Sequence, residues 1–263
     1  VSRQREAPMR PQGGEPRDPE AGIVVMAKLP SAGDPKSRLG TLLTREQRIA
    51  FQSALLSDAL ARAQSVATTY LAFTPPEAIE EANAYSGLRA FPDEGVDLGE
   101  RMARAAERVL ACGHAAVIVV GTDCPYLTAG DLAEAAAQLR EVDVSLGPAL
   151  DGGYYLIGLR RLHRGVFVGV PWSSPLTLAT TIERALELGL TYRLGGPLPD
   201  VDSPADFHEL ALNAAGLGRQ EVHSPRVTVL LRSWYPELAT RDSASGTCAF
   251  SSKKPAGSRR GRT

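Results

Sequence analysis

Residues 117–125 read VIVVGTDCP, an unbroken run of four β-forming residues followed by a glycine and a single acid. Because no polar residue alternates with the apolar ones, the run predicts a strand buried on both faces of a parallel sheet. Asp123 follows its carboxyl end, the edge at which open α/β sheets bind ligands. The next helix already has a cap in Thr128, three residues before Asp131. We therefore interpret Asp123 as a functional acid; the alternative is an ordinary turn residue.

On both sides of this strand, apolar runs and amphipathic segments alternate along the chain. We expect strands at 23–27, 66–73, 88–91, 142–149, 154–159 and 192–194, and helices at 44–63, 98–112, 128–141, up to 188 and from 203. Ser173 or Ser174 is the expected cap of the helix that ends at 188, and residues 227–231 read as an edge strand. This alternation predicts one α/β domain over residues 22–238, with a mostly parallel central sheet and helices on both faces.

The two ends and the bulk composition exclude several classes of partner. Residues 1–21 are rich in Pro, Gly, Arg and Glu, and residues 239–263 in Ser, Gly, Lys and Arg, which predicts a disordered leader and a disordered basic tail. A formal net charge of −1 gives no signal for a nucleic acid or membrane partner. Three cysteines form neither a disulfide framework nor a zinc pair, and no apolar run approaches the roughly 20 residues of a membrane span. We expect a cytoplasmic protein; its oligomeric state stays open.

A basic loop follows the first expected strand, in the segment KLPSAGDPKSRLG at residues 28–40. Lys28, Lys36 and Arg38 project from it among prolines and glycines. We interpret the loop as a cradle for nucleotide phosphates, in which Gly33 lets the backbone come close and Arg38 grips two oxygens. The alternative is a solvated basic loop. The segment at residues 28–40 lacks the residue spacing of a Walker phosphate-binding loop.

A second candidate for anion binding lies at the start of the helix expected from residue 98. Asp97 is its expected cap, and Gly99 and Arg101 fall in its first turn, where free amide groups can meet an anion. Arg104 and Arg108, further along, are interpreted as a solvated face.

Residues 150–159, LDGGYYLIGL, place an acid and two glycines before a strand. Adjacent glycines at a strand start indicate a bulge or a backbone that a ligand approaches closely, at Gly152 and Gly153. The alternative is a plain hairpin with Asp151-Gly152 in its turn. Tyr154 and Tyr155 point to opposite faces of the sheet, so only one of them can face the crevice.

The last informative segment is PDVDSPADF, at residues 199–207. Ser203 with Asp206 forms a capping box that starts a helix. Asp200 and Asp202 precede it and point to the same side of an extended segment, where their charges repel unless a positive group lies nearby. A hard divalent cation, which prefers oxygen ligands, would serve.

With these residues in view, the chain resembles the nucleotide-diphospho-sugar transferase (GT-A type) superfamily. More closely, it is similar to the rSAM/selenodomain-associated, arsenosugar-biosynthesis-type glycosyltransferases. Four blocks carry the resemblance: MAKLPSAGDPKSRLG, DLGERM, VVGTDCPYLT with GPALDGGYYLIGL, and DVDSPADF. The layout is also similar to the guanylyltransferases of molybdopterin and phospholactate cofactors. The resemblance implies a single-domain, Rossmann-like GT-A fold.

The resemblance also implies roles for individual residues. It puts Lys28, Lys36 and Arg38 at the nucleotide phosphates, and a divalent metal, Mg²⁺ or Mn²⁺, on Asp123 and Asp202. It makes Asp151 the catalytic acid nearest the reacting carbon, with the substrate approaching Gly152, Gly153 and Tyr154.

One departure from the family pattern is Asp34, an acid before Pro35 and Lys36 where an apolar residue is more usual. It weakens the phosphate interpretation of this loop.

The expected function is a metal-dependent glycosyltransferase that moves a sugar from a nucleoside-diphosphate sugar to a small-molecule acceptor. The first alternative is a guanylyltransferase-like nucleotidyltransferase, which transfers a nucleoside monophosphate from a triphosphate and releases pyrophosphate. The second is a nucleotide-binding module without turnover.

Overall fold

The computed structural model describes residues 20–30, 33–85 and 87–239. The predicted leader and tail lie almost wholly outside these ranges. The first strand begins at Ala21, one residue before the predicted start of the domain.

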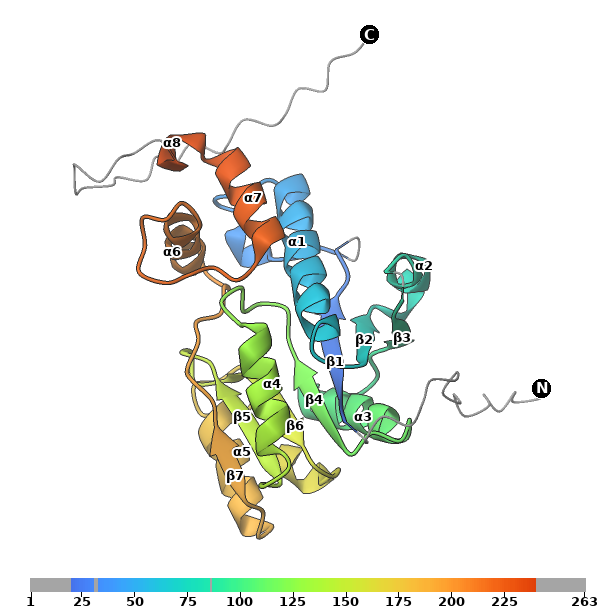
Figure 1. Ribbon diagram of the computed structural model, residues 1–263. Coiled ribbons are helices and arrows are strands. Elements are labelled where there is room, and N and C mark those ends of the chain that lie inside the picture. The colour runs from blue at the N-terminus through green and yellow to red at the C-terminus, as the bar shows by residue number, and fades with distance from the viewer. Residues whose placement is uncertain (1–19, 31–32, 86, 240–263) are drawn as a thin grey trace.

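Seven strands form one sheet in the order β3-β2-β1-β4-β6-β5-β7 (Figure 1). Neighbouring strands are parallel except at β6, which is antiparallel to β4 and β5. The strands are β1 (Ala21–Lys28), β2 (Thr69–Thr74), β3 (Arg89–Pro92), β4 (Ala116–Val120), β5 (Val144–Pro148), β6 (Tyr154–Leu159) and β7 (Tyr192–Leu194). The predicted fold class, a mostly parallel α/β sheet, is confirmed.

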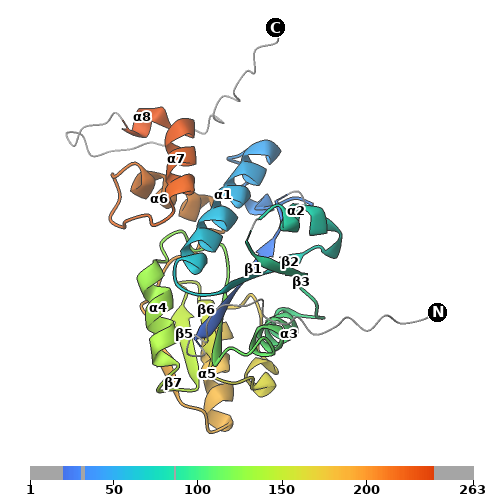
Figure 2. The same ribbon diagram turned by 45° about the vertical axis from the view of Figure 1, so that its right-hand side comes forward.

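Helices cover both faces of this sheet (Figures 1 and 2). Residues of α1, α4, α6 and α7 belong to the hydrophobic cluster on one face, and residues of α3 and α5 to the cluster on the other. The helices are α1 (Arg45–Gln64), α2 (Ile79–Asn83), α3 (Leu98–Leu110), α4 (Ala129–Gln138), α5 (Thr177–Glu187), α6 (Pro204–Ala214), α7 (Pro225–Trp234) and α8 (Pro236–Ala239). Among the described residues, no helix combines the length and apolar character needed to cross a membrane.

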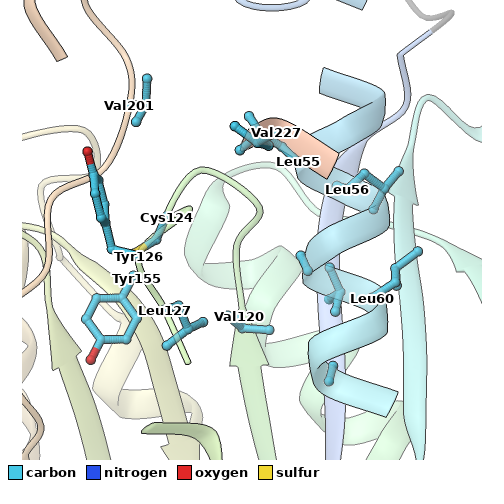
Figure 3. Packing of buried hydrophobic residues seen from close by; sticks show 14 of the residues in the cluster. Leu55, Leu56, Leu60, Val120, Cys124, Tyr126, Leu127, Tyr155, Val201 and Val227 are labelled. Carbon is cyan, nitrogen blue, oxygen red and sulfur yellow. The ribbon is translucent and has the colours of Figure 1, made fainter. Parts of the chain in front are cut away.

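Strand β4 lies in the interior of the sheet, as its apolar run predicts. All five of its residues are buried. Val117 and Val119 belong to the cluster beneath α3, whereas Ile118 and Val120 belong to the cluster beneath α1 and α4. Figure 3 shows Val120 near the α1 side chains of this second cluster. Because both faces are covered, every side chain of β4 has to be apolar, and the carboxyl end at Gly121 is where the chain can first carry a polar group.

Local capping signals fix where the helices around the site begin. Thr44 caps α1 with Gln47, Thr128 caps α4 with Asp131, and Ser203 caps α6 with Asp206, all as full capping boxes. Asp97 caps α3 by accepting a hydrogen bond from the Glu100 amide. The caps predicted at Asp97, Thr128 and Ser203 are confirmed.

Two predicted local features are wrong. Leu176, not Ser173 or Ser174, is the N-cap residue of α5, and it forms no side-chain capping bond. Residues 227–231 lie within helix α7, not in an edge strand. Val227 and Leu231, four residues apart, are both buried there, because residues at this spacing lie on the same face of a helix.

Candidate active site

A cleft of about 500 Å³ opens at the carboxyl ends of β1 and β4. Five of the predicted phosphate-binding and metal-binding residues line it together: Lys28, Lys36, Arg38, Asp123 and Asp202. They come from three separate segments, namely the loop after β1, the turn after β4 and the segment before α6. The fold therefore brings the basic loop and both predicted metal-binding acids to one place, as expected for the crevice of an open α/β sheet.

Lys36 is the centre of this cluster. Its Nζ lies 2.9 Å from Asp123 Oδ1 and 3.1 Å from Asp202 Oδ1, and it donates a 2.7 Å hydrogen bond to the carbonyl of Val201. Its side chain is only 6% exposed, whereas those of the two acids are 44% and 45% exposed. Burial lowers the pKa of Lys36, but Asp123 and Asp202 more than offset this, so the net pKa is raised. Lys36 therefore stays charged.

The conformation of the loop aims Lys36 at the acids. Lys36 itself adopts a left-handed backbone conformation, φ 49° and ψ 41°, which is unfavourable for a residue with a side chain. Arg48 of α1 holds the preceding residues in place: it forms an ion pair with Asp34 and donates a 3.2 Å hydrogen bond to the Pro35 carbonyl. Asp34 is therefore neutralised by Arg48 and does not compete with Asp123 and Asp202 for Lys36.

Asp123 is held from two sides. The Thr122 hydroxyl lies 3.2 Å from its Oδ1, and the Val201 amide donates a 3.0 Å hydrogen bond to its backbone carbonyl. Gln52, buried on α1, donates in turn to the Thr122 hydroxyl at 3.4 Å. Sequence reasoning missed Gln52. The signal was present, because Arg48 and Gln52 are polar residues four apart on the face of α1 that also carries Leu55.

Asp123 and Asp202 suit a divalent cation that arrives with a substrate. Each is half-exposed, lines the cleft and offers the hard oxygen ligands that Mg²⁺ and Mn²⁺ accept. Among the described residues, no group of three or more His, Cys, Asp and Glu side chains is arranged to hold a metal by itself. Mg²⁺ is commonly bound through one or two carboxylates, with phosphate oxygens and water completing its shell. The donor set fits that mode of binding.

The remaining predicted phosphate ligands differ in position. Lys28 and Arg38 line the cleft and are exposed, Arg38 at 74% with its Nη1 3.7 Å from Asp202 Oδ2. Gly33 has a left-handed φ of 69°, and its carbonyl accepts a hydrogen bond from Arg45. It is not among the described residues that line the cleft.

Gly99 and Arg101 have structural tasks away from the cleft lining. A Cβ at Gly99 would lie 2.4 Å from Cζ2 of Trp172, so only glycine lets α3 pack there. Arg101 pairs with the buried Asp93, with Nη1 3.3 Å from Oδ2, and burial raises the pKa of that acid. Leu98 of the same helix turn lines the cleft instead.

Residues 149–153 form the tight turn of a hairpin, because β5 and β6 are antiparallel neighbours. The structure therefore has a hairpin, the alternative interpretation of this segment, with a register shift between Gly147 and Pro148. Gly152 has φ 90°, and a Cβ there would lie 2.3 Å from the carbonyl oxygen of Pro175. The need for glycine at this position is explained by packing against Pro175. Asp151 accepts a 2.8 Å hydrogen bond from the Gly153 amide.

The two tyrosines after this turn lie in opposite core layers, as their alternation predicts. Tyr155 belongs to the cluster beneath α4, and its hydroxyl donates a 3.0 Å hydrogen bond to the Gly196 carbonyl. Tyr154 packs against the cluster on the other face, and burial raises the pKa of its hydroxyl. Both residues nevertheless line the cleft. The expectation that only one of the two rings faces the crevice stays a prediction.

A second cavity of about 230 Å³ adjoins the cleft and shares Asp123 and both tyrosines with it. Asp151 and Asp200 line this second cavity. Burial, with the nearby charge of Asp151, raises the pKa of Asp200 to about 6. The sequence pattern did not distinguish Asp200 from Asp202. In the structure, Asp200 lines the second cavity and Asp202 lines the cleft. Other lining residues that sequence reasoning missed are Trp172, Ser173, Ser174 and Thr177.

Comparison with known proteins relates this arrangement to nucleotide-using transferases. A family model described as an uncharacterized protein conserved in bacteria (DUF2064) matches residues 56–174. A crystal structure of a protein from Desulfovibrio desulfuricans G20, assigned as a nucleotide-diphospho-sugar transferase, is 26% identical with a TM-score of 0.73. The match covers 83% of this chain and 96% of that one.

Curated relatives point to the same class of chemistry. The 2-phospho-L-lactate guanylyltransferase of Methanoculleus marisnigri is 26% identical over 191 residues, which cover 72% of this chain and 81% of that protein. The phosphoenolpyruvate guanylyltransferase of Sphaerobacter thermophilus is 30% identical over 196 residues, which cover 73% of this chain and 92% of that protein. The cleft, its charged cluster and these similarities lead to one conclusion: the chain belongs to the same family of transferases as the Sphaerobacter guanylyltransferase.

Proposed function

We propose that the protein is a metal-assisted nucleotidyltransferase that moves a nucleoside monophosphate from a triphosphate to a small-molecule acceptor and releases pyrophosphate. The observation that carries the proposal is the buried Lys36 ammonium, held between Asp123 and Asp202 in a cleft of about 500 Å³. Kinship with guanylyltransferases makes GTP the first donor to test. This reverses the order of the two functions expected from the sequence.

The charge of the cluster supports a role for a divalent metal. One ammonium and two carboxylates sum to a net charge of −1, which repels a triphosphate. A divalent cation on Asp123 and Asp202 would bring this sum to about +1 and would supply Lewis-acid stabilisation of the phosphate oxygens. The exposed cations Lys28 and Arg38 add to the attraction at the mouth of the cleft.

The proposed reaction is an in-line displacement at the α-phosphorus. An acceptor oxygen forms a bond to that phosphorus, the bond to the oxygen bridging the β-phosphate breaks, and pyrophosphate leaves with the electron pair. Lys36, Lys28 and Arg38 stabilise the negative charge that develops on the phosphate oxygens. When the acceptor is a hydroxyl, its proton passes to a carboxylate, for which Asp151 is our candidate.

The test is pyrophosphate release from GTP, ATP, CTP and UTP, each with Mg²⁺ or Mn²⁺ and a set of acceptors. Asp123→Asn should lower turnover by about 10²-fold or more, because metal-assisted charge stabilisation is lost. Glu183→Gln, which removes an exposed acid on α5, is the matched control. Full activity of Asp123→Asn would show that the metal assignment is wrong.

Glycosyl transfer is the second candidate, favoured by the similarity to the protein assigned as a nucleotide-diphospho-sugar transferase. The same cleft would then hold a nucleoside-diphosphate sugar, and the released product would be a nucleoside diphosphate. Identifying the product therefore separates the two reactions. Nucleotide binding without either product would instead indicate a module without turnover.

A further inference from the structure

The cavity beside the cleft is placed to receive the acceptor. It lies between the β5–β6 turn and the residues that lead into α5, and it shares Asp123 and Tyr154 with the cleft. Its volume of about 230 Å³ is below the roughly 300–1,000 Å³ of a site for a drug-sized ligand. The occupant is therefore a small molecule.

The charge of this cavity is negative. Among the described residues that line it, Asp123, Asp151 and Asp200 are acids, and none is a lysine, arginine or histidine. Asp123 has Lys36 as its partner. Within residues 20–30, 33–85 and 87–239, no cation lies within ion-pair distance of the other two acids. A second anionic group placed here would meet two carboxylates that have no cationic partner among the described residues, and their repulsion disfavours its binding.

The other walls suit a hydroxylated or positively charged molecule. Trp172 is fixed in place by Gly99 on one side and by Phe167, whose ring centroid is 6.4 Å away. An aromatic ring beside carboxylates is a combination that binds organic cations. The hydroxyl groups of Ser173 and Ser174 can exchange hydrogen bonds with an alcohol, whereas that of Thr177 already donates to the Pro171 carbonyl.

We propose that the acceptor is a small alcohol of neutral or positive charge that carries neither a phosphate nor a carboxylate. The inference rests on the proposed nucleotidyl transfer. It sets this chain apart from its relatives, whose names specify phosphoenolpyruvate and 2-phospho-L-lactate, both acids that carry a phosphate.

The chemistry of the reaction agrees with an alcohol. A phosphate oxygen can attack as an anion without losing a proton, whereas a hydroxyl must lose one as its oxygen bonds to the α-phosphorus. In this chain the proton passes from the hydroxyl to the Asp151 carboxylate as pyrophosphate leaves. A carboxylate-lined cavity supplies such a base, which a phosphate acceptor does not need.

The experiment is calorimetric titration of four probes into the full chain saturated with Mg²⁺ and a non-hydrolysable GTP analogue. The probes are choline, ethanolamine, glycerol and phosphoenolpyruvate. We expect the two cationic alcohols to bind, glycerol to bind more weakly and phosphoenolpyruvate not to bind. Asp151→Asn and Asp200→Asn should each weaken choline binding about tenfold, whereas Glu183→Gln should leave it unchanged.

Each outcome decides the matter. Binding of phosphoenolpyruvate, with pyrophosphate release from GTP in its presence, would overturn the inference and leave the proposed function standing. Binding of the GTP analogue without binding of choline, ethanolamine or glycerol would also overturn it. Failure of every nucleoside triphosphate to bind would remove the proposed function, and this inference with it.

Discussion

Lys36 makes three polar contacts through a single atom, to Asp123, Asp202 and the Val201 carbonyl. Because its side chain is 6% exposed, its ammonium group is held in one position and its charge is little screened by water. A flexible surface lysine would have to be ordered at each binding event, whereas this one is already placed. We infer that its main role is electrostatic preorganisation of the cleft.

Lys36→Met therefore has a defined expected result. Under the proposed function, the affinity for GTP with Mg²⁺ should fall about tenfold or more, because a nearly buried charge at the proposed phosphate site is lost. Stability should change little, since both acids are half-exposed and regain water. Calorimetric titration measures the affinity, and Arg164→Ala, which removes an exposed cation paired with Glu107, is the control. An unchanged affinity would remove Lys36 from the donor site.

Asp143 makes a prediction about pH. Hydrogen bonds from the Thr191 amide and hydroxyl, together with Arg160, lower the pKa of Asp143 to about 2. Since its pKa in the unfolded chain is about 3.9, the stabilisation is present above about pH 4 and is lost as pH falls through about 2. At neutral pH, Asp143→Asn should cost about 1 kcal/mol, less than the full shift implies because solvent screens the group.

Urea unfolding at pH 7 and at pH 3 measures this effect. The difference in unfolding free energy between wild type and Asp143→Asn should shrink at the lower pH. The exposed Glu183→Gln serves as the control for the general effect of removing a negative charge. A difference that stays constant across this range would show that the ionised form of Asp143 is not what stabilises the fold.

At the scale of elements, a substitution at Gly99 tests whether the start of α3 serves packing or anion binding. Gly99→Ala places a Cβ 2.4 Å from the Trp172 ring, so we expect a loss of roughly 1–3 kcal/mol from overpacking. Gly196→Ala is a matched control, because nothing lies within 4 Å of a Cβ built there. Thermal or denaturant unfolding measures both. A Gly99→Ala variant of unchanged stability that no longer binds nucleotide would favour the anion-binding interpretation.

The elements differ in how far the sequence could predict them. Caps such as Thr128 with Asp131 were predictable because both partners lie within one helix turn. The start of α5 was not, because the Thr177 hydroxyl donates to the Pro171 carbonyl and no serine caps the helix. Val227 to Leu231 is a short apolar run, and such runs suit a strand or a helix equally well until a packing partner is known.

The same limit applies to the site. Lys36, Asp123 and Asp202 could each be selected from the sequence because of their positions after expected strands or before an expected helix. That the lysine lies between the two acids could not, since 166 residues separate Lys36 from Asp202. Gln52 and Trp172 were missed because their roles depend on which segments pack beside them.

At the scale of the whole molecule, the late helix α7 lies against the early helix α1 (Figure 1). Figure 3 shows Val227 of α7 beside Leu55 of α1. Asp58 of α1 is 1% exposed and accepts hydrogen bonds from the amides of Arg226 and Val227, at 2.9 and 3.1 Å, while also pairing with Arg226. It therefore supplies the N-terminal capping that α7 lacks from Ser224.

Asp58→Ala should destabilise the protein by about 3 kcal/mol, because it leaves two backbone donors at the helix start without their buried acceptor. Asp58→Asn keeps one acceptor oxygen and should lie in between. Denaturant unfolding measures both variants. A loss below about 1 kcal/mol for Asp58→Ala would mean that water replaces the carboxylate, and that α7 is held by apolar contacts alone.

The distance in sequence between Lys36 and Asp202 also bears on when the charged cluster is completed during synthesis. During synthesis the lysine leaves the ribosome long before the acid that completes its environment, 166 positions later. Until then the cation lacks one of its two counter-charges. A chain that ends before residue 202 therefore lacks one of the two carboxylates around Lys36, and under the proposed function it would not bind a nucleotide together with its metal. Under the proposed function, nucleotide transfer therefore becomes possible only after Asp202 has been synthesised and has packed beside Lys36.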